Sequence, residues 1–344
     1  MRITGLHRSQ DVLVELVRAY RKLGPKGTLT ISYPNPLQQT LNPKAGPNWL
    51  APETMTTLLS QAGFAKLAHG WWFGLPGTQF AKTLSQGLLA RLVCPMIYFI
   101  AEKQPLPQEK NYSVSVIIPC KDEEGNIARA VKSVPKLGRF TEVVVVDDGS
   151  TDQTAQIVKN LKLKIKNLKL ISYQPNRGKR QAVTAGFKSA KGEIVMIWDA
   201  DMTVPASELE LFITPLRRGI AQLTNGARFI YPMQEKAMKR TNFVGNKLMS
   251  LLFSWVLGQH VTDTLCGNKA LFKKDWLKIK MMPDDPWGDF SLLLGASRLG
   301  LKIQDVPVHY LARTAGASKM KTIQHGLYLL KAALKGLVFL KLRF

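Results

Sequence analysis

The stretch IVMIWDAD, residues 194–201, decides the fold of this chain. Five apolar residues without alternation predict a strand that is covered on both faces of a parallel sheet. Asp199 and Asp201 follow where this strand should reach the edge of the sheet, and an open α/β sheet binds its ligands beyond the carboxyl ends of its strands. Two such carboxylates suit a hard divalent cation that substrate phosphates and water complete. The stretch therefore predicts a site for a metal and a nucleotide diphosphate.

The same pattern recurs earlier in the chain, where the apolar run 143–146 leads into Asp147 and Asp148. Apolar runs alternate with amphipathic segments between 112 and 200, which predicts right-handed βαβ crossovers and a doubly wound sheet. The expected strands are 114–118, 142–146, 168–172 and 194–198, and the expected helices are 124–134, 151–161 and 179–190. From 207 the order becomes mixed, with expected helices 207–217, 237–258 and 288–299 and expected strands 220–229, 268–272 and 302–308.

Composition divides the chain into four parts. Prolines and charged residues at 105–111 predict a linker. Residues 112–318 make up the doubly wound domain, and 319–344 form a basic, apolar helix. The first part, 1–104, is expected to be a partial α/β unit with helices at 11–23 and 52–63 and a strand at 28–32.

The chain is strongly basic, with 48 Lys and Arg against 24 Asp and Glu, a formal charge of +24. This excess predicts a polyanionic partner, which can be nucleic acid, an anionic membrane or a phosphorylated substrate. The basic stretches carry no interleaved aromatics for stacking bases, so we do not expect nucleic acid. Three cysteines without metal-ligand spacing fit a reducing compartment.

The chain shows neither a signal-peptide pattern nor eighteen consecutive uncharged apolar residues, so a cytoplasmic location is expected. The C-terminal stretch 326–344 is apolar with regularly spaced cations. Such a helix suits the interface of an anionic membrane, which would place the protein peripherally at the inner face. Packing against the rest of the protein is the equally open alternative.

Five ordered motifs carry a family resemblance. They are VIIPCKDEE (116–124), VVVVDDGSTD (143–152), NRGKRQA (176–182), IWDADM (197–202) and VTDTLCGNKAL (261–271). Together they resemble glycosyltransferase family 2, whose members are inverting enzymes of GT-A fold that use nucleotide-activated sugars. Lys121 and Asp122 depart from the commoner aromatic-Asn pair before Glu123. The Gln-x-x-Arg-Trp motif of processive synthases is missing from the sequence, which argues against polymerisation.

Two further resemblances refine this picture. Asn225-Gly226-Ala227-Arg228 and Arg313-x-x-Gly316-x-Ser318-Lys319 are similar to segments of dolichol- and polyprenyl-phosphate sugar transferases. Residues 1–104 resemble the C-terminal part of a class I methyltransferase that uses S-adenosylmethionine. The glycine-rich turn that would cradle that cofactor is missing, so no methyl transfer is expected.

The family resemblance implies a donor site at the acidic strand ends. Asp201 would bind Mg²⁺ or Mn²⁺ and assist catalysis through it, and Asp199 would contact the metal or the ribose. Asp148 or Asp147 would bind the base or ribose while the other caps a helix, a role that suits Asp. The nucleotide pocket would also include Pro119, Glu123 and Lys179. For Lys179 the alternative is a solvated basic face.

The resemblance also implies an acceptor site. Asp289 would act as general base toward a hydroxyl acceptor and would only orient a phosphate acceptor, which is mostly ionised at neutral pH; its alternative role is the N-cap of helix 288–299. Arginine suits bidentate phosphate contacts, whereas lysine supplies a point charge. The expected acceptor and phosphate-binding residues are Arg228, Arg240, Asp263, Gly267, Arg313, Ser318 and Lys319, with a purely structural turn as the alternative for Asp263 and Gly267.

The hypothesis that follows is a metal-dependent transferase that moves a hexose from a UDP- or GDP-sugar to a polyprenyl-phosphate lipid. A transferase that acts on a saccharide or another hydroxyl acceptor in cell-envelope glycan synthesis is the close alternative. A nucleic-acid-binding protein and an inactive scaffold are the more distant ones; the retained Asp148, Asp199 and Asp201 argue against the scaffold.

Overall fold

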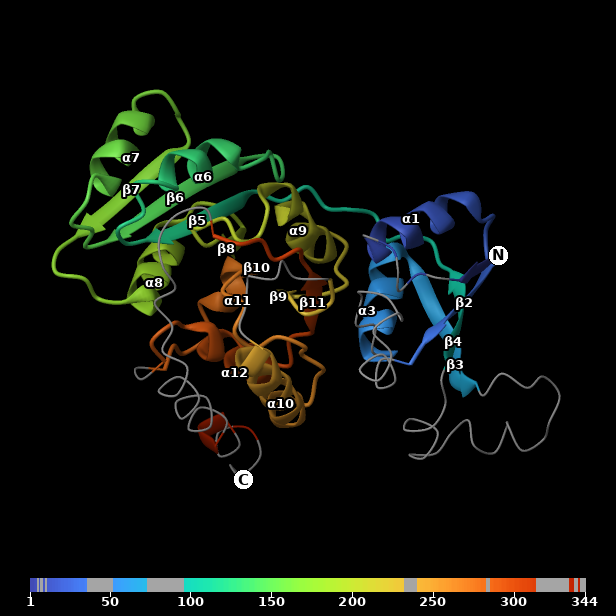
Figure 1. Cartoon of the computed structure of the whole chain (residues 1–344). Helices are drawn as coiled ribbons and strands as arrows, with labels where there is room; N and C mark the ends of the chain where they lie inside the picture. The colour runs from blue at the N-terminus through green and yellow to red at the C-terminus, as the bar shows by residue number, and fades with distance from the viewer. Residues whose placement is uncertain are drawn as a thin grey trace. The chain divides into compact units, whose positions relative to one another are not determined.

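The computed structural model describes residues 1–4, 6, 9, 11–35, 52–72, 96–231, 240–282, 285–313, 334–336 and 340, and only the backbone of 240–248. The chain divides into two compact units (Figure 1). One consists of Met1–Pro107 with Phe229–Pro232, and the other of Gln108–Arg228 with Met233–Phe344. We call them the N-terminal unit and the sheet unit.

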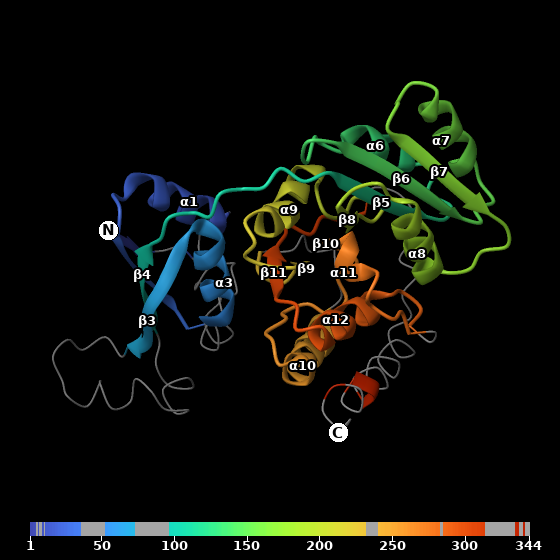
Figure 2. The same ribbon diagram turned by 180° about the vertical axis from the view of Figure 1, so that it is seen from behind.

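The sheet unit is built on a seven-stranded mixed sheet in the order β11-β9-β10-β8-β5-β6-β7 (Figures 1 and 2). Neighbouring strands among β5, β6, β7 and β8 pair in parallel, β10 runs antiparallel to β8 and β9, and β11 is parallel to β9. The bounds are β5 Val114–Cys120, β6 Thr141–Asp148, β7 Leu168–Tyr173, β8 Ile194–Ile197, β9 Leu223–Ala227, β10 Lys269–Phe272 and β11 Ile303–Pro307. The mixed, doubly wound sheet expected from the sequence is therefore confirmed.

Helices cover both faces of this sheet. The apolar residues of α6 (Ile127–Ser133), α7 (Thr154–Lys162) and α9 (Leu209–Arg217) join one buried cluster. Those of α8 (Lys179–Ser189), α10 (Arg240–Leu257), α11 (Lys273–Trp276) and α12 (Asp289–Arg298) join the other. The short 3₁₀ helix η3 (Ala206–Glu208) precedes α9. Each expected helix lies within three residues of an observed one at both ends, with α6, α7 and α10 each beginning three residues late, whereas α11 was not expected from the sequence.

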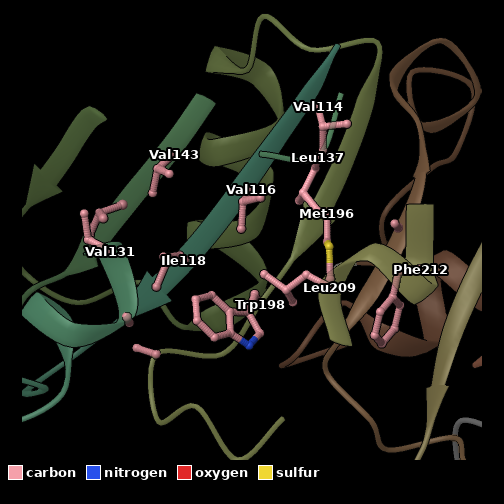
Figure 3. Packing of buried hydrophobic residues seen from close by; sticks show 14 of the residues in the cluster. Val114, Val116, Ile118, Val131, Leu137, Val143, Met196, Trp198, Leu209 and Phe212 are labelled. Carbon is pink, nitrogen blue, oxygen red and sulfur yellow. The ribbon is translucent and has the colours of Figure 1, made fainter. Parts of the chain in front are cut away.

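The central strands explain why unbroken apolar runs predicted them. Val114, Val116 and Ile118 of β5 point to the α6, α7 and α9 side, where Val143, Met196, Trp198 and Phe212 pack with them (Figure 3). Ile117 of the same strand belongs to the opposite cluster. Because successive side chains of a strand point to opposite faces, a strand covered on both sides must be apolar at every position.

The N-terminal unit has a four-stranded sheet in the order β1-β2-β4-β3. Its strands are β1 Arg2–Thr4, β2 Thr28–Pro34, β3 Phe64–Trp72 and β4 Met96–Lys103, with helices α1 Val12–Lys22 and α3 Pro52–Ala62. The sequence predicted the two helices and β2 but missed the other strands. These strands alternate or carry charges, and β4 begins inside the apolar stretch 88–101.

None of the helices that the structure describes is long and apolar enough to cross a bilayer. The expected C-terminal helix at 319–343 lies mostly outside the described residues. Within it, 334–336 and 340 are helical.

Candidate functional site

A cleft of about 460 Å³ lies at the carboxyl ends of β5, β6 and β8 in the sheet unit. Most residues expected at the site line it: Pro119, Glu123, Asp148, Lys179, Asp199, Asp201, Arg228, Gly267, Asp289 and Arg313. The fold brings them together because parallel strands end at the same edge of the sheet. Segments from distant parts of the sequence, among them the start of α12, complete the wall.

The two acids at the end of β6 have different roles. Asp148 lines the cleft, and its carboxylate accepts backbone hydrogen bonds from Arg177 (2.7 Å) and Gly178 (2.8 Å) just before α8. Asp147 is buried and accepts hydrogen bonds from the Ser150 backbone N–H (3.0 Å) and the Ser172 hydroxyl (2.8 Å). Asp147 lies outside the cleft lining, so its expected nucleotide contact is corrected to a role in holding the turn.

Asp199 is paired with a cation in the cleft. Its Oδ1 lies 2.5 Å from Lys179 Nζ. Burial alone favours the neutral acid, but the charge and hydrogen bond of Lys179 outweigh burial and hold the pKa of Asp199 below its usual value. Burial opposes the charge of Lys179 as well, and Asp199 again outweighs it and raises the lysine pKa. Lys179 is thus a half-buried, ion-paired residue of the cleft.

Gly267 lies against this ion pair. A Cβ at this position would be 2.5 Å from Lys179 Nζ and 2.6 Å from an Asp199 carboxylate oxygen. The glycine is therefore needed for space beside the two charged groups, which gives its place in the motif a steric reason.

Asp201 is held from two sides. Its Oδ1 accepts hydrogen bonds from the backbone N–H (3.2 Å) and hydroxyl (3.0 Å) of Thr203, and its Oδ2 lies 2.9 Å from the Arg313 guanidinium. Arg313 follows β11, and the Leu311 N–H donates to the Thr203 carbonyl (2.9 Å), so the two segments run side by side. Arg313, which the sequence analysis assigned to the acceptor site, thus lies beside Asp201.

The two acids fit a metal that a substrate shares. Among the described residues, no group of three His, Cys, Asp or Glu could hold an ion by itself. Mg²⁺ is commonly bound by one or two carboxylates together with substrate phosphates, so Asp199 and Asp201 are sufficient protein ligands. A bound cation would compete with Lys179 and Arg313 for their carboxylates.

Asp289, at the start of α12, is buried and lies 2.9 Å from Lys269 Nζ. Burial raises the pKa of Asp289, and Lys269 and Lys179 oppose that rise without cancelling it. The sequence analysis missed Lys269, although a lysine in the apolar strand NKALF (268–272) requires a buried partner. The lysine is fully buried on β10 and also donates to the Cys266 carbonyl.

Asp285, also missed, caps α12. Its carboxylate accepts hydrogen bonds from the backbone N–H groups of Gly288 (2.9 Å) and Ser291 (2.8 Å). The alternative that Asp289 serves as the N-cap is therefore wrong. Asp289 remains directed to the cleft and to Lys269.

Arg228 reaches the cleft from a buried ion pair. Its Nε and Nη2 lie 2.6 Å and 2.9 Å from the two carboxylate oxygens of Asp263. Asp263 is fully buried and lies outside the cleft lining, so its expected acceptor contact is corrected to positioning Arg228. The Tyr310 ring, also in the lining and also missed, has its centroid 5.1 Å from the guanidinium carbon.

The remaining expected residues are not brought to the cleft by the described structure. Arg240 begins α10, and the structure describes only its backbone. Ser318 and Lys319 lie outside the described residues.

An α/β fold with acids and cations at one sheet edge is typical of enzymes that bind nucleotides and phosphates, and comparisons with known proteins identify the family. The model of glycosyl transferase family 2 matches residues 115–279. A dolichyl-phosphate beta-glucosyltransferase (ALG5A) of Trichomonas vaginalis is 30% identical over 240 residues, which cover 64% of this chain and 72% of that protein. This chain belongs to glycosyltransferase family 2.

Other relatives agree. The glycosyltransferase AglJ of Haloferax volcanii is 27% identical, with 67% of this chain and 71% of that protein covered. Among solved structures, a glucosyl-3-phosphoglycerate synthase of Mycobacterium tuberculosis, crystallised with Mn²⁺, UDP and its product, has a TM-score of 0.50 at 21% identity, covering 66% of this chain and 79% of that one. The fold is thus GT-A, and the chain is a glycosyltransferase.

Proposed function

We propose that this protein transfers a hexose from a UDP- or GDP-sugar to a polyprenyl phosphate, with a divalent cation and with inversion at the sugar. The observation that carries this proposal is the arrangement of charges in one cleft. Asp148, Asp199 and Asp201 provide the donor side, and Arg228 and Arg313 provide cations for a second phosphate. The dolichyl-phosphate relatives support the choice of a lipid phosphate.

In this reaction the bond between sugar C1 and the donor phosphate breaks, and its electron pair leaves with the nucleotide diphosphate. An acceptor phosphate oxygen forms the new bond to C1 from the opposite face. Mg²⁺ or Mn²⁺ at Asp199 and Asp201 would stabilise the charge of the leaving diphosphate. Lys179 adds a positive charge beside it, and Arg228, fixed by Asp263, binds the acceptor phosphate. An ionised phosphate needs no deprotonation, so Asp289 only orients it.

The test is transfer of radiolabelled sugar from UDP- and GDP-hexoses to polyprenyl phosphate with Mn²⁺ in detergent. We expect labelled lipid with at least one donor and none with Asp201→Asn. If no common donor gives labelled lipid, the proposal of a polyprenyl-phosphate acceptor is wrong. Transfer to a hydroxyl acceptor is then the second candidate, because Asp289 lines the cleft and its raised pKa suits a base. Asp289→Asn should nearly abolish that reaction but only weaken transfer to phosphate.

We also propose that the N-terminal unit is a remnant of a methyltransferase that transfers no methyl group, and that the protein acts peripherally at the cytoplasmic face of a membrane. The similarity of residues 1–104 to a class I methyltransferase suggests the relationship, the lack of a glycine-rich turn within these residues supports the absence of methyl transfer, and the charge of +24 supports the membrane location. S-adenosylmethionine should leave the melting temperature unchanged.

A further inference from the structure

Helix α10 exposes an apolar stripe where a surface helix normally carries polar residues. Leu251 is 68% exposed and Trp255, one turn later, is 59% exposed. The opposite face, with Phe253, Val256 and Leu257, is buried in the core of the sheet unit. Large apolar side chains that share one exposed helix face mark an interaction surface rather than scattered exceptions.

A helical turn near the C-terminus, residues 334–336, packs against the core close to α10. Gly336 packs so closely on the core that a Cβ there would lie 2.8 Å from Leu294 and 3.1 Å from Val256 of α10. Leu340 also packs against the core cluster. Leu334 remains 56% exposed beside them. The described turn 334–336 and α10 lie side by side in both views (Figures 1 and 2). We call Leu251 and Trp255 the apolar face.

The basic sequence around α10 indicates which partner the apolar face binds. Residues 236–262, which include α10, contain four Lys or Arg and no Asp or Glu, and 313–344 contain seven and none. A segment that is basic in sequence and carries exposed Leu and Trp suits a surface that enters anionic lipid, and Trp prefers that interface. A second copy of this chain would bring the same cations face to face, so self-association is disfavoured.

The position of α10 fits a lipid acceptor. Phe253 of α10 stacks on Phe290 of α12, with ring centroids 5.0 Å apart, and Phe290 directly follows Asp289 in the cleft. The apolar face is thus about one helix diameter, roughly 10 Å, from the helix that carries Asp289. We propose that the apolar face enters an anionic bilayer and so holds the cleft at the lipid surface. This inference rests on the proposed function and names its membrane-binding surface.

Vesicle sedimentation tests the inference. The wild type should sediment with vesicles of phosphatidylcholine and phosphatidylglycerol, and Leu251→Ser/Trp255→Ser should reduce the bound fraction at least tenfold. The matched control is Leu163→Ser. Leu163 is 87% exposed and has a lysine on each side in the sequence. It follows α7 and precedes β7, so it lies at the amino ends of the parallel strands, away from the cleft. Brominated lipid should quench less fluorescence in Trp255→Phe than in the wild type.

Three outcomes would overturn the inference. In the first, the double variant binds vesicles as well as the wild type does, and in the second, Leu163→Ser loses vesicle binding. The third is a wild type that forms a dimer without lipid and becomes monomeric in the double variant. Circular dichroism and nucleotide binding verify that each variant is folded. A short, water-soluble prenyl phosphate separates this inference from the proposed function. If sugar is transferred to this acceptor without vesicles, the proposed function stands even when vesicle binding fails. If the protein binds vesicles but transfers no sugar, only the membrane-binding surface is supported.

Discussion

Lys269 and Asp289 place two opposite charges in the interior of the sheet unit. Each charge is tolerable there only because the other is present, since a buried charge without a partner is strongly unfavourable. The pair also joins β10 to the start of α12, and so fixes the position of the Asp289 carboxylate in the cleft. The packing of β10 against α12 therefore determines where this carboxylate lies in the cleft.

Lys269→Met should destabilise the sheet unit by about 3–5 kcal/mol, the usual effect of removing one partner from a buried ion pair. Lys269→Met/Asp289→Asn should recover part of this loss. Urea unfolding measures both. The control is Lys278→Met, which breaks a loose 3.8 Å contact between the exposed Lys278 ammonium and Asp275 and should change the free energy of unfolding by less than about 1 kcal/mol. Equal effects of Lys269→Met and Lys278→Met would contradict the role of the buried pair.

Gly267→Ala should remove nucleotide binding while the protein remains folded. The new methyl group meets the ends of two side chains, Lys179 and Asp199, which can move aside without moving the backbone. Their displacement breaks the donor side of the cleft, so UDP or GDP with Mn²⁺ should no longer raise the melting temperature. Gly24→Ala, at a glycine with open space around it, is the control and should keep the shift. A normal shift in Gly267→Ala would show that the ion pair is dispensable.

At the scale of elements, the segment after β11 organises the cleft. The His309 backbone N–H donates to the Glu208 carboxylate at 3.0 Å, and the His309 ring lies 2.6 Å from the same group. These bonds attach the segment to η3, while Tyr310 and Arg313 reach the cleft from it. A chain segment distant in sequence from Asp201 is thus joined to the loop that carries this acid.

The loop before β10 positions Arg228 through Asp263, and this contact predicts a pH dependence. Burial raises the pKa of Asp263, but Arg228 outweighs burial and lowers it below the usual value. A lowered native pKa gives stability that is complete above the unfolded value of about 3.9 and is lost as the pH falls through the native pKa. The stability difference between wild type and Asp263→Asn should therefore be largest at neutral pH and shrink below about pH 4.

Urea unfolding at a series of pH values checks this. Arg139→Gln, which removes an exposed partner of Glu193, is the control and should cost less than about 1 kcal/mol at neutral pH. A difference between wild type and Asp263→Asn that grows toward acid would contradict the assignment.

At the scale of the whole molecule, the net charge of +24 contrasts with a cleft that gathers several of the 24 acids. The carboxylates of the cleft lie beside lysine and arginine side chains. Such a mixed site suits a ligand that carries both positive and negative charge, as a metal-bound diphosphate does. The rest of the surface can then attract anionic lipid without weakening the donor site.

Nucleotide and metal should accordingly stabilise the protein only together. UDP or GDP with Mn²⁺ at about a hundred times the dissociation constant should add about 2.7 kcal/mol by mass action. Either component alone should add much less, and EDTA should remove the effect. Thermal unfolding measures these shifts, with Asp201→Asn as the control. Equal stabilisation by nucleotide in EDTA would contradict a shared metal.

The sequence by itself determined the seven-stranded sheet and most of the residues that line the cleft. Unbroken apolar runs identify strands that are covered on both faces, and acids at their ends must meet at one edge; Asp148, Asp199 and Asp201 were found in this way. The strands of the N-terminal unit were missed because β4 and its neighbours alternate or carry charges, so their pattern is weaker.

Only the tertiary structure decided which charge neutralises which. The sequence placed Asp263 and Asp147 among the binding residues, but packing turned Asp263 inward to Arg228 and Asp147 toward its own turn. It also paired Lys269 with Asp289 across 20 residues of chain. Local patterns specify strands and turns, whereas ion pairs depend on distances between segments that are remote in sequence, and those distances are set only when the elements pack.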